Sequence, residues 1–200
     1  MSAAQMLSTQ LLDAAMLNYL RCKFPQLSAD ELAVQIEETL RFLFIADECT
    51  GSIPVSREID EIWHAWILQT QEYMALCERL PTGRYIHHSS NQYLRYFDAT
   101  VGEGEDLSES VKMLALYVAN FGPFEPQRAP HWLLVRHMTS QWHWPLEAVN
   151  DWLCTTPAEP TSICQSVLAK AASAGQDRAH DHALLQPTTQ RQPPGDAARP

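Results

Sequence analysis

Apolar residues recur every three to four positions along most of the first 170 residues, which is the spacing of one face of an α-helix. This spacing predicts longer helices over residues 4–23, 28–44, 56–68, 71–80, 106–121 and 145–152, and short ones over 91–97 and 161–168. No segment alternates apolar and polar residues in the way that a half-buried strand does. The pattern therefore predicts an all-α fold, a compact bundle of about six to eight helices.

Polar residues between the apolar runs mark where helices begin and end. Ser28, with Glu31 three positions later, forms a capping box, and Thr70 is placed to cap the helix that follows it. Pro81–Gly83 predicts a turn. After this turn we expect residues 84–90 to form an extended loop that carries a pair of histidines.

The composition changes after about residue 172. Ala, Gln, Pro, Thr, Asp and Gly dominate this C-terminal stretch, and bulky apolar residues are few. Such a segment cannot bury enough apolar surface to offset the entropy lost on folding. We therefore predict that residues 1–172 form a single all-α domain and that residues 173–200 form a disordered tail.

Charge and cysteine content narrow the classes of function. The net charge is 14 − 24 = −10, so the chain lacks the positive surface that binding to nucleic acid or an anionic membrane requires. The five cysteines are irregularly spaced, with no C-x-x-C, which favours a reducing compartment. Neither a signal peptide nor ~18 uninterrupted apolar residues occur. We therefore expect a cytoplasmic protein whose partner is a small molecule or another protein, with no nucleic acid and no membrane.

The segment Asp60–His88 concentrates side chains that bind metals or move protons. Asp60 and His64 are one helical turn apart, at the edge of the apolar face of their helix. Adjacent residues of an extended segment point to opposite sides, so at most one of His87 and His88 easily meets His64. A carboxylate with two imidazoles suits zinc, or non-haem iron with open coordination positions. This is the candidate site of the chain.

Other residues of the segment are weaker candidates. Cys77 is a further metal ligand candidate, although a small buried thiol is equally at home in a core. The hydroxyl of Tyr73 or Tyr85 would lie behind the metal ligands or face a substrate. Two alternatives stay open: Asp60 and His64 form a hydrogen-bonded pair that only orders the core, or they form a metal-free acid–base site without a visible nucleophile.

A second group of histidines accompanies tryptophans further along the chain. His131, His137 and His143 are six residues apart, so on a helix they lie on different faces and do not form a ligand set. We interpret Trp132, Trp142 and Trp144 as core anchors with histidines as polar neighbours. The alternative is a tryptophan-rich surface that receives a partner.

The candidate segment also carries a longer pattern. Asp60–Tyr73, Cys77 and Gly83–His88 resemble the D-x-x-W-H-x-H-I-L-x-T-x-x-Y, C and G-x-[FY]-[IL]-H-H signature of the bacterial relatives of the plant glycine-rich-domain proteins. Tyr117–Pro123 resembles a second motif of that family, and the resemblance covers about residues 42–132. A metal role for the histidines of that family is an inference from their residue type. Trp66, however, stands where the signature has its second histidine, and an indole cannot ligate a metal.

Two functions therefore compete. In the first, the chain is a small metal-binding protein that holds zinc or iron. It would then act as a metal-dependent enzyme on a small molecule or a peptide. In the second, it is a non-catalytic protein-interaction module in which the Asp, His and Trp residues are a structural network. The chain has no Gly-rich phosphate loop, G-x-S-x-G or H-E-x-x-H motif, which argues against common nucleotide-binding, serine-hydrolase and zinc-protease classes.

Overall fold

The computed structural model describes residues 3–46, 48–49, 55–88 and 105–156. Over these ranges the chain forms helices and no strand, which confirms the all-α prediction. The elements are α1 (Ala3–Leu11), α2 (Ala14–Lys23), α3 (Ala29–Ala46), α4 (Arg57–Ile67), α5 (Thr70–Arg79), α7 (Glu105–Phe121), the 3-10 helix η1 (Ala129–His131), α8 (Leu133–Ser140) and α9 (Leu146–Thr155). The predictions for 91–97, 161–168 and the tail at 173–200 lie outside the described residues.

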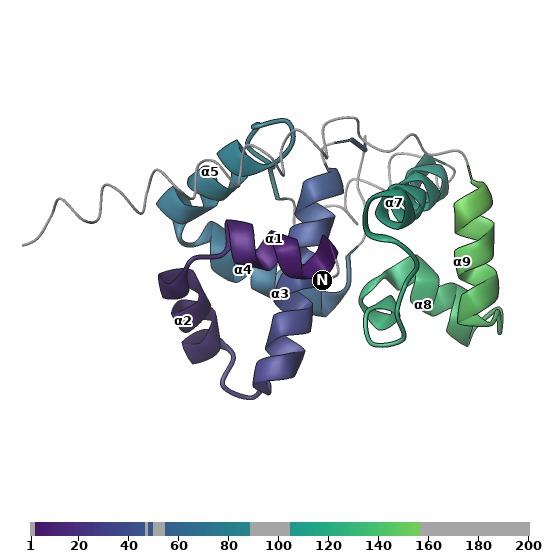
Figure 1. Ribbon diagram of the computed structural model, residues 1–200, viewed down its shortest axis with the longest axis horizontal. Coiled ribbons are helices and arrows are strands. Elements are labelled where there is room, and N and C mark those ends of the chain that lie inside the picture. Colours follow the sequence, from purple (N-terminus) through teal and green to yellow (C-terminus); the bar gives the residue numbers. More distant parts are fainter. Residues whose placement is uncertain (1–2, 47, 50–54, 89–104, 157–200) are drawn as a thin grey trace, which may run out of the picture.

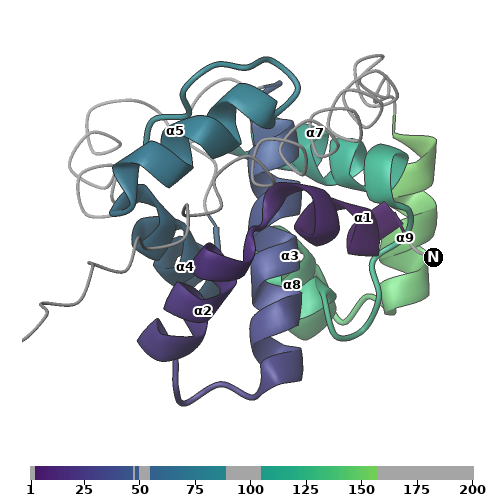
Figure 2. The same cartoon turned by 60° about the vertical axis from the view of Figure 1, so that its left-hand side comes forward.

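Helix α3 is the centre of the molecule. Figure 1 shows α2, α4 and α5 on one side of it and α7, α8 and α9 on the other, and Figures 1 and 2 both show α1 lying across α3 itself. Helices α1, α4 and α7 pack directly against it. Every residue from Ile36 to Ile45 is buried, including the charged ones, so the helix has no solvent-facing stripe over this stretch. A helix enclosed all round in this way belongs to the interior of a fold rather than its surface.

The helix predicted over residues 4–23 is instead two helices, and this is a correction. Helix α1 ends at Leu11, and α2 begins at Ala14 with Asp13 as its N-cap. The Asp13 carboxylate accepts a hydrogen bond of 2.6 Å from the backbone N–H of Met16. The first backbone N–H groups of a helix have no partner within the helix, and this bond provides one of them with an acceptor. The cap therefore lowers the free-energy cost of starting a new helix at Ala14, which apolar periodicity does not reveal.

The other predicted boundaries within the described residues hold to within three residues. The capping box is confirmed, because Glu31 N–H donates to Ser28 Oγ and Ser28 N–H donates to the Glu31 carboxylate, at 3.2 and 2.9 Å. Thr70 was expected as a cap but is the first residue of α5, and the capping position belongs to Gln69, whose side chain makes no capping bond. Across the described residues, none of the helices is long and apolar enough to cross a membrane.

The C-terminal helices pack around the aromatic ring of Tyr117. Phe124 stacks on it with ring centroids 4.0 Å apart, and Trp132 meets it edge-on at 4.9 Å. Trp132 is buried, as expected of a core anchor. The same interpretation is wrong for Trp142 and Trp144, which are 49% and 38% exposed. They lie on the short turn between α8 and α9, where His137 of α8 and Trp152 of α9 cover them only in part.

Candidate functional site

Three of the predicted ligands come together beside α4. Nε2 of His88 lies 2.8 Å from Oδ1 of Asp60, and Nδ1 of His64 lies 3.4 Å from Oδ2 of the same carboxylate. The two imidazole rings are 4.1 Å apart between centroids. One ligand atom from each residue lies within 4.8 Å of the other two, and no other group of three such side chains occurs in the described ranges.

Helix α4 positions two of these side chains and the segment after α5 brings the third. Ser56 caps α4, where its Oγ accepts from the backbone N–H of Ile59, and this places Asp60 and His64 on adjacent turns of one face. The predicted turn before the histidine segment is also present. Gly83 adopts a positive φ of 67° there, which glycine tolerates without strain. The chain then returns to α4 in a segment whose exposure alternates, with Ile86 and His88 partly buried and His87 exposed.

Exposure and hydrogen bonding differ among the three residues. The side chains of His88 and Asp60 are 10% and 21% exposed, whereas that of His64 is 48% exposed. We expected His64 to be half-buried, so it reaches further into solvent than the helical wheel implied. Nδ1–H of His64 donates to the backbone carbonyl of Asp60 at 2.8 Å, because a carbonyl oxygen can only accept. This leaves the lone pair of His64 on Nε2.

The two distances from the Asp60 carboxylate, 2.8 and 3.4 Å, are close to those between atoms that share one ion. Metal–ligand bonds of about 2.0–2.2 Å place neighbouring ligand atoms of a tetrahedral site about 3–3.5 Å apart. The Asp60 carboxylate lies against both imidazoles, so a cation bound between them would replace the hydrogen bond between His88 and Asp60. Three protein ligands would leave at least one coordination position open on the exposed side, next to His64.

The structure does not bring the remaining candidates into this group. His87 is exposed, and its ring lies 5.0 Å from that of Tyr85. Cys77 is 2% exposed in α5 and lies in the core. The prediction that only one of the adjacent histidines meets His64 is therefore met, with His88 as that residue.

Tyr73 lies behind the site rather than facing solvent. It is fully buried, and its hydroxyl accepts from the indole N–H of Trp63 at 2.9 Å and donates to the carbonyl of Ile86 at 2.7 Å. Burial raises the pKa of Tyr73, an effect that nearby Cys77 and Tyr85 increase. Tyr85, by contrast, is 45% exposed and can meet a ligand from solvent.

Trp66, which stands in place of a histidine of the signature, is a core residue. Its side chain is 1% exposed. A histidine at this position of α4 would therefore lie in the interior, away from the solvent-exposed His64. Ala65, which a helical wheel places on the side opposite the apolar face, is also buried. Helix α4 contacts α2 as well as α3 and α5, so its covered face is wider than one apolar stripe.

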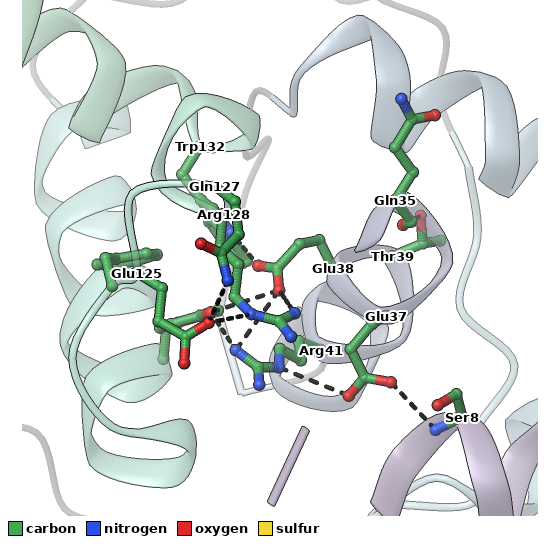
Figure 3. A network of polar contacts seen from close by, with 12 residues as sticks. Ser8, Gln35, Glu37, Glu38, Thr39, Arg41, Glu125, Gln127, Arg128 and Trp132 are labelled. Atoms are coloured by element: carbon green, nitrogen blue, oxygen red, sulfur yellow. Dashed lines mark hydrogen bonds and ion pairs between the residues drawn. The ribbon is translucent and has the colours of Figure 1, made fainter. Parts of the chain in front are cut away.

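Sequence reasoning missed a buried network of charges, shown in Figure 3. Glu38 on α3 is fully buried, and its Oε1 pairs with Arg128 at 2.6 Å and with Arg41 at 3.4 Å. Its Oε2 accepts from the indole N–H of Trp132 at 2.8 Å. Arg41 in turn donates to the hydroxyl of Tyr117. The signal that could have revealed this network is a pair of glutamates and an arginine inside an otherwise apolar helix.

The network extends to both sides of α3. Glu37 pairs with Arg41 at 3.6 Å and accepts from the backbone N–H of Ser8 on α1 at 3.2 Å. Burial raises the pKa of Glu37, although Ser8 and the arginines oppose that effect. On the other side, Arg128 also pairs with Glu125 at 3.0 Å. Polar contacts therefore link α1, α3 and the segment that leads to η1.

His131 lies next to this network at the end of η1. Burial lowers its pKa, and the neighbouring Glu38 and Glu58 only partly offset that effect. Its Nδ1 and one carboxylate oxygen of Glu58 are among the buried side-chain atoms that have no hydrogen-bond partner in the described structure. The surroundings of His131 therefore favour its neutral form over its protonated form.

Fold and site together define a small all-α protein with a two-histidine, one-carboxylate cluster at the edge of its N-terminal helices. A protein-family model described as UCP032817-like matches residues 2–107, more than half of the chain. The chain belongs to this family, and the match includes all of Asp60–His88. No curated protein and no solved structure matches the chain.

Proposed function

We propose that this protein binds a divalent transition-metal ion, zinc or ferrous iron, through Asp60, His64 and His88. The observation that carries the proposal is the convergence of a carboxylate and two imidazoles whose ligand atoms lie within 4.8 Å of one another. Imidazole nitrogen favours zinc and iron over magnesium and calcium, which prefer oxygen ligands. His87 and Cys77 are not ligands in this proposal, and their substitution should leave the site intact.

The partial exposure of the cluster supports a catalytic rather than a purely structural metal. Structural zinc sites are closed by four protein ligands, whereas three ligands leave a position for water or substrate. A bound ion would act there as a Lewis acid and would lower the pKa of a coordinated water. We propose that its substrate is a small molecule or a peptide that approaches past His64 and Tyr85.

The resemblance to the glycine-rich-domain proteins is part of this proposal. Their signature has an acid, a tryptophan and a histidine at the positions of Asp60, Trp63 and His64. If the resemblance reflects common descent, those relatives would use the same carboxylate and imidazole. The position of Trp66 in the core supports the view that its substitution leaves the site able to bind an ion.

Metal content measured by elemental mass spectrometry tests the proposal. The protein should be untagged and purified without chelator under low oxygen. We expect near-stoichiometric zinc or iron in the wild type and in His87→Ala, and a loss of that metal in His64→Ala and His88→Ala. An equal metal content in all four proteins, or no bound metal with a melting curve that ignores added zinc and ferrous iron, would refute it.

A second candidate function rests on the turn between α8 and α9. Trp142 and Trp144 are exposed there, with ring centroids 6.2 Å apart, and His137 meets Trp142 edge-on at 5.2 Å. Exposed tryptophans are enriched where proteins bind one another. We propose this surface as the partner site of an interaction module. Loss of a captured partner in a Trp142→Ser/Trp144→Ser variant, but not in His64→Ala, would favour this function over metal binding.

A further inference from the structure

We propose that the hydroxyl of Tyr73 is the positioning group that holds His88 against Asp60. Three parts of the chain meet at this one oxygen: α4 through Trp63, α5 through Tyr73 itself, and the histidine segment through Ile86. The consequence for metal affinity rests on the proposed function, whereas the positioning of His88 does not.

The directions of the two hydrogen bonds leave the hydroxyl a single arrangement. An indole N–H can only donate and a backbone carbonyl can only accept. Tyr73 must therefore accept from Trp63 at 2.9 Å and spend its one proton on the Ile86 carbonyl at 2.7 Å. Phenylalanine at position 73 would leave both partners without this bond, beside the buried side chains of Tyr73 and Trp63.

The bond to Ile86 acts on His88 through the backbone. Residues two apart in an extended segment point to the same side, so Ile86 and His88 face the protein while His87 faces away. The burial of these residues follows that alternation, because Ile86 packs against the core and His87 is exposed. Fixing the carbonyl of Ile86 therefore fixes where the His88 side chain begins.

The bond from Trp63 acts on His88 through its ring. The Trp63 indole meets the His88 imidazole edge-on, with centroids 4.5 Å apart and planes inclined by 76°. The same indole packs against Phe42 of α3 at 5.2 Å, so it is held on its other side by the central helix. The hydroxyl of Tyr73 thus fixes both the backbone before His88 and the surface on which its ring rests.

The experiment compares Tyr73→Phe with two matched variants that also remove one tyrosine hydroxyl. Tyr85→Phe alters the half-exposed ring that packs on Tyr73 at 5.2 Å. Tyr117→Phe removes a fully buried hydroxyl from the other half of the molecule, so it controls for general loss of stability. The first readout, on metal-free protein, is the set of nuclear Overhauser effects between the Trp63 indole and the His88 imidazole. The second is the affinity for Zn²⁺, with the absorption spectrum of the Co²⁺ form.

We expect Tyr73→Phe to lose the Trp63–His88 effects and to bind Zn²⁺ about 10- to 100-fold more weakly, with an altered Co²⁺ spectrum. Both controls should keep the effects and the affinity, even though Tyr117→Phe lowers the melting temperature. Retention of the Trp63–His88 effects in Tyr73→Phe would overturn the inference. A wild type that binds no metal would refute the proposed function alone, because the metal-free readout still decides the positioning.

If Tyr73→Phe does not fold, the inference is tested on the wild-type protein instead. The inference requires a slowly exchanging Tyr73 hydroxyl proton with effects to both the Trp63 indole N–H and the backbone around Ile86. The absence of such a proton in a wild-type spectrum that resolves the indole N–H would overturn it.

Discussion

His88 donates to Asp60 over 2.8 Å although the two residues are 28 positions apart in the chain. Nδ1 of His64, one turn further along α4, lies 3.4 Å from the other oxygen of the same carboxylate. Asp60 is therefore the residue through which the helix and the returning segment meet. Its substitution should disturb the candidate site more than that of any single histidine.

Asp60→Asn tests this central role. Asparagine keeps the shape of the side chain but removes the negative charge that both imidazoles face. We expect the affinity for Zn²⁺ to fall about 100-fold or more, measured by competition with a chromogenic chelator. The matched control is Glu61→Gln on the same helix, whose carboxylate pairs with Arg57 on the surface, and it should leave the affinity unchanged. Equal losses in both variants would mean that general charge, not the site, governs binding.

Removal of the charge on Glu38 should be severely destabilising. In Glu38→Gln the guanidinium groups of Arg41 and Arg128 stay buried but lose their shared counter-ion. Breaking a buried ion pair from one side costs about 3–5 kcal/mol. Glu125→Gln, which removes the half-exposed partner of Arg128, should cost less than about 1 kcal/mol. Urea denaturation at neutral pH measures both, and similar losses in the two variants would contradict the prediction.

The buried imidazole of His131 predicts a dependence of stability on pH. Because burial lowers its pKa, the unfolded chain takes up a proton near the ordinary value of 6.5 while the folded chain resists it. The free energy of unfolding should therefore fall as the pH drops below about 6.5, and stop falling through this group once the pH passes the folded pKa. Among the charged neighbours, Glu38 and Glu58 raise the pKa of His131, whereas Arg128 and Arg136 lower it together with burial.

His131→Asn should flatten this dependence between about pH 5 and 7. His137→Asn, which removes an exposed histidine from α8, serves as its control and should leave the slope unchanged. Chemical denaturation at several pH values measures the slope. An equal slope in the wild type and in His131→Asn would show that His131 is protonated as easily in the folded as in the unfolded state.

The break between α1 and α2 depends on the cap at Asp13. Asp13→Ala removes the acceptor for the Met16 N–H and should lower the free energy of unfolding by about 1 kcal/mol. Asp30→Ala in the first turn of α3 removes a charge of the same sign without removing a cap, and should cost only a few tenths of a kcal/mol. Thermal denaturation distinguishes the two, and an equal effect would assign the loss to charge alone.

Spacing along the chain was sufficient to predict part of the site. Asp60 and His64 follow from helical periodicity, and the alternation of an extended segment limits the adjacent histidines to one. Spacing could not say which of the two turns inward. That choice depends on Tyr73 and Trp63, whose contacts with the histidine segment are tertiary.

The errors share a physical cause. Helical periodicity treats a charged residue as a surface residue, and so it overlooked Glu37, Glu38 and Arg41, which are buried and form ion pairs with one another. It also treated Trp142 and Trp144 as buried because they are large and apolar. Whether a side chain is covered depends on which helices pack over it, and a single sequence does not contain that information.

The burial of α3 on every side has a consequence for dissecting the protein. The stretch shared with the UCP032817-like family ends at residue 107, inside α7, and Arg128 and Trp132 come after it. A fragment cut at that point would keep Glu38 while losing the guanidinium and indole that neutralise and cover it. Such a fragment would expose to water charged and apolar side chains of α3 that are buried in the whole protein. We expect it to self-associate rather than to fold as an independent domain.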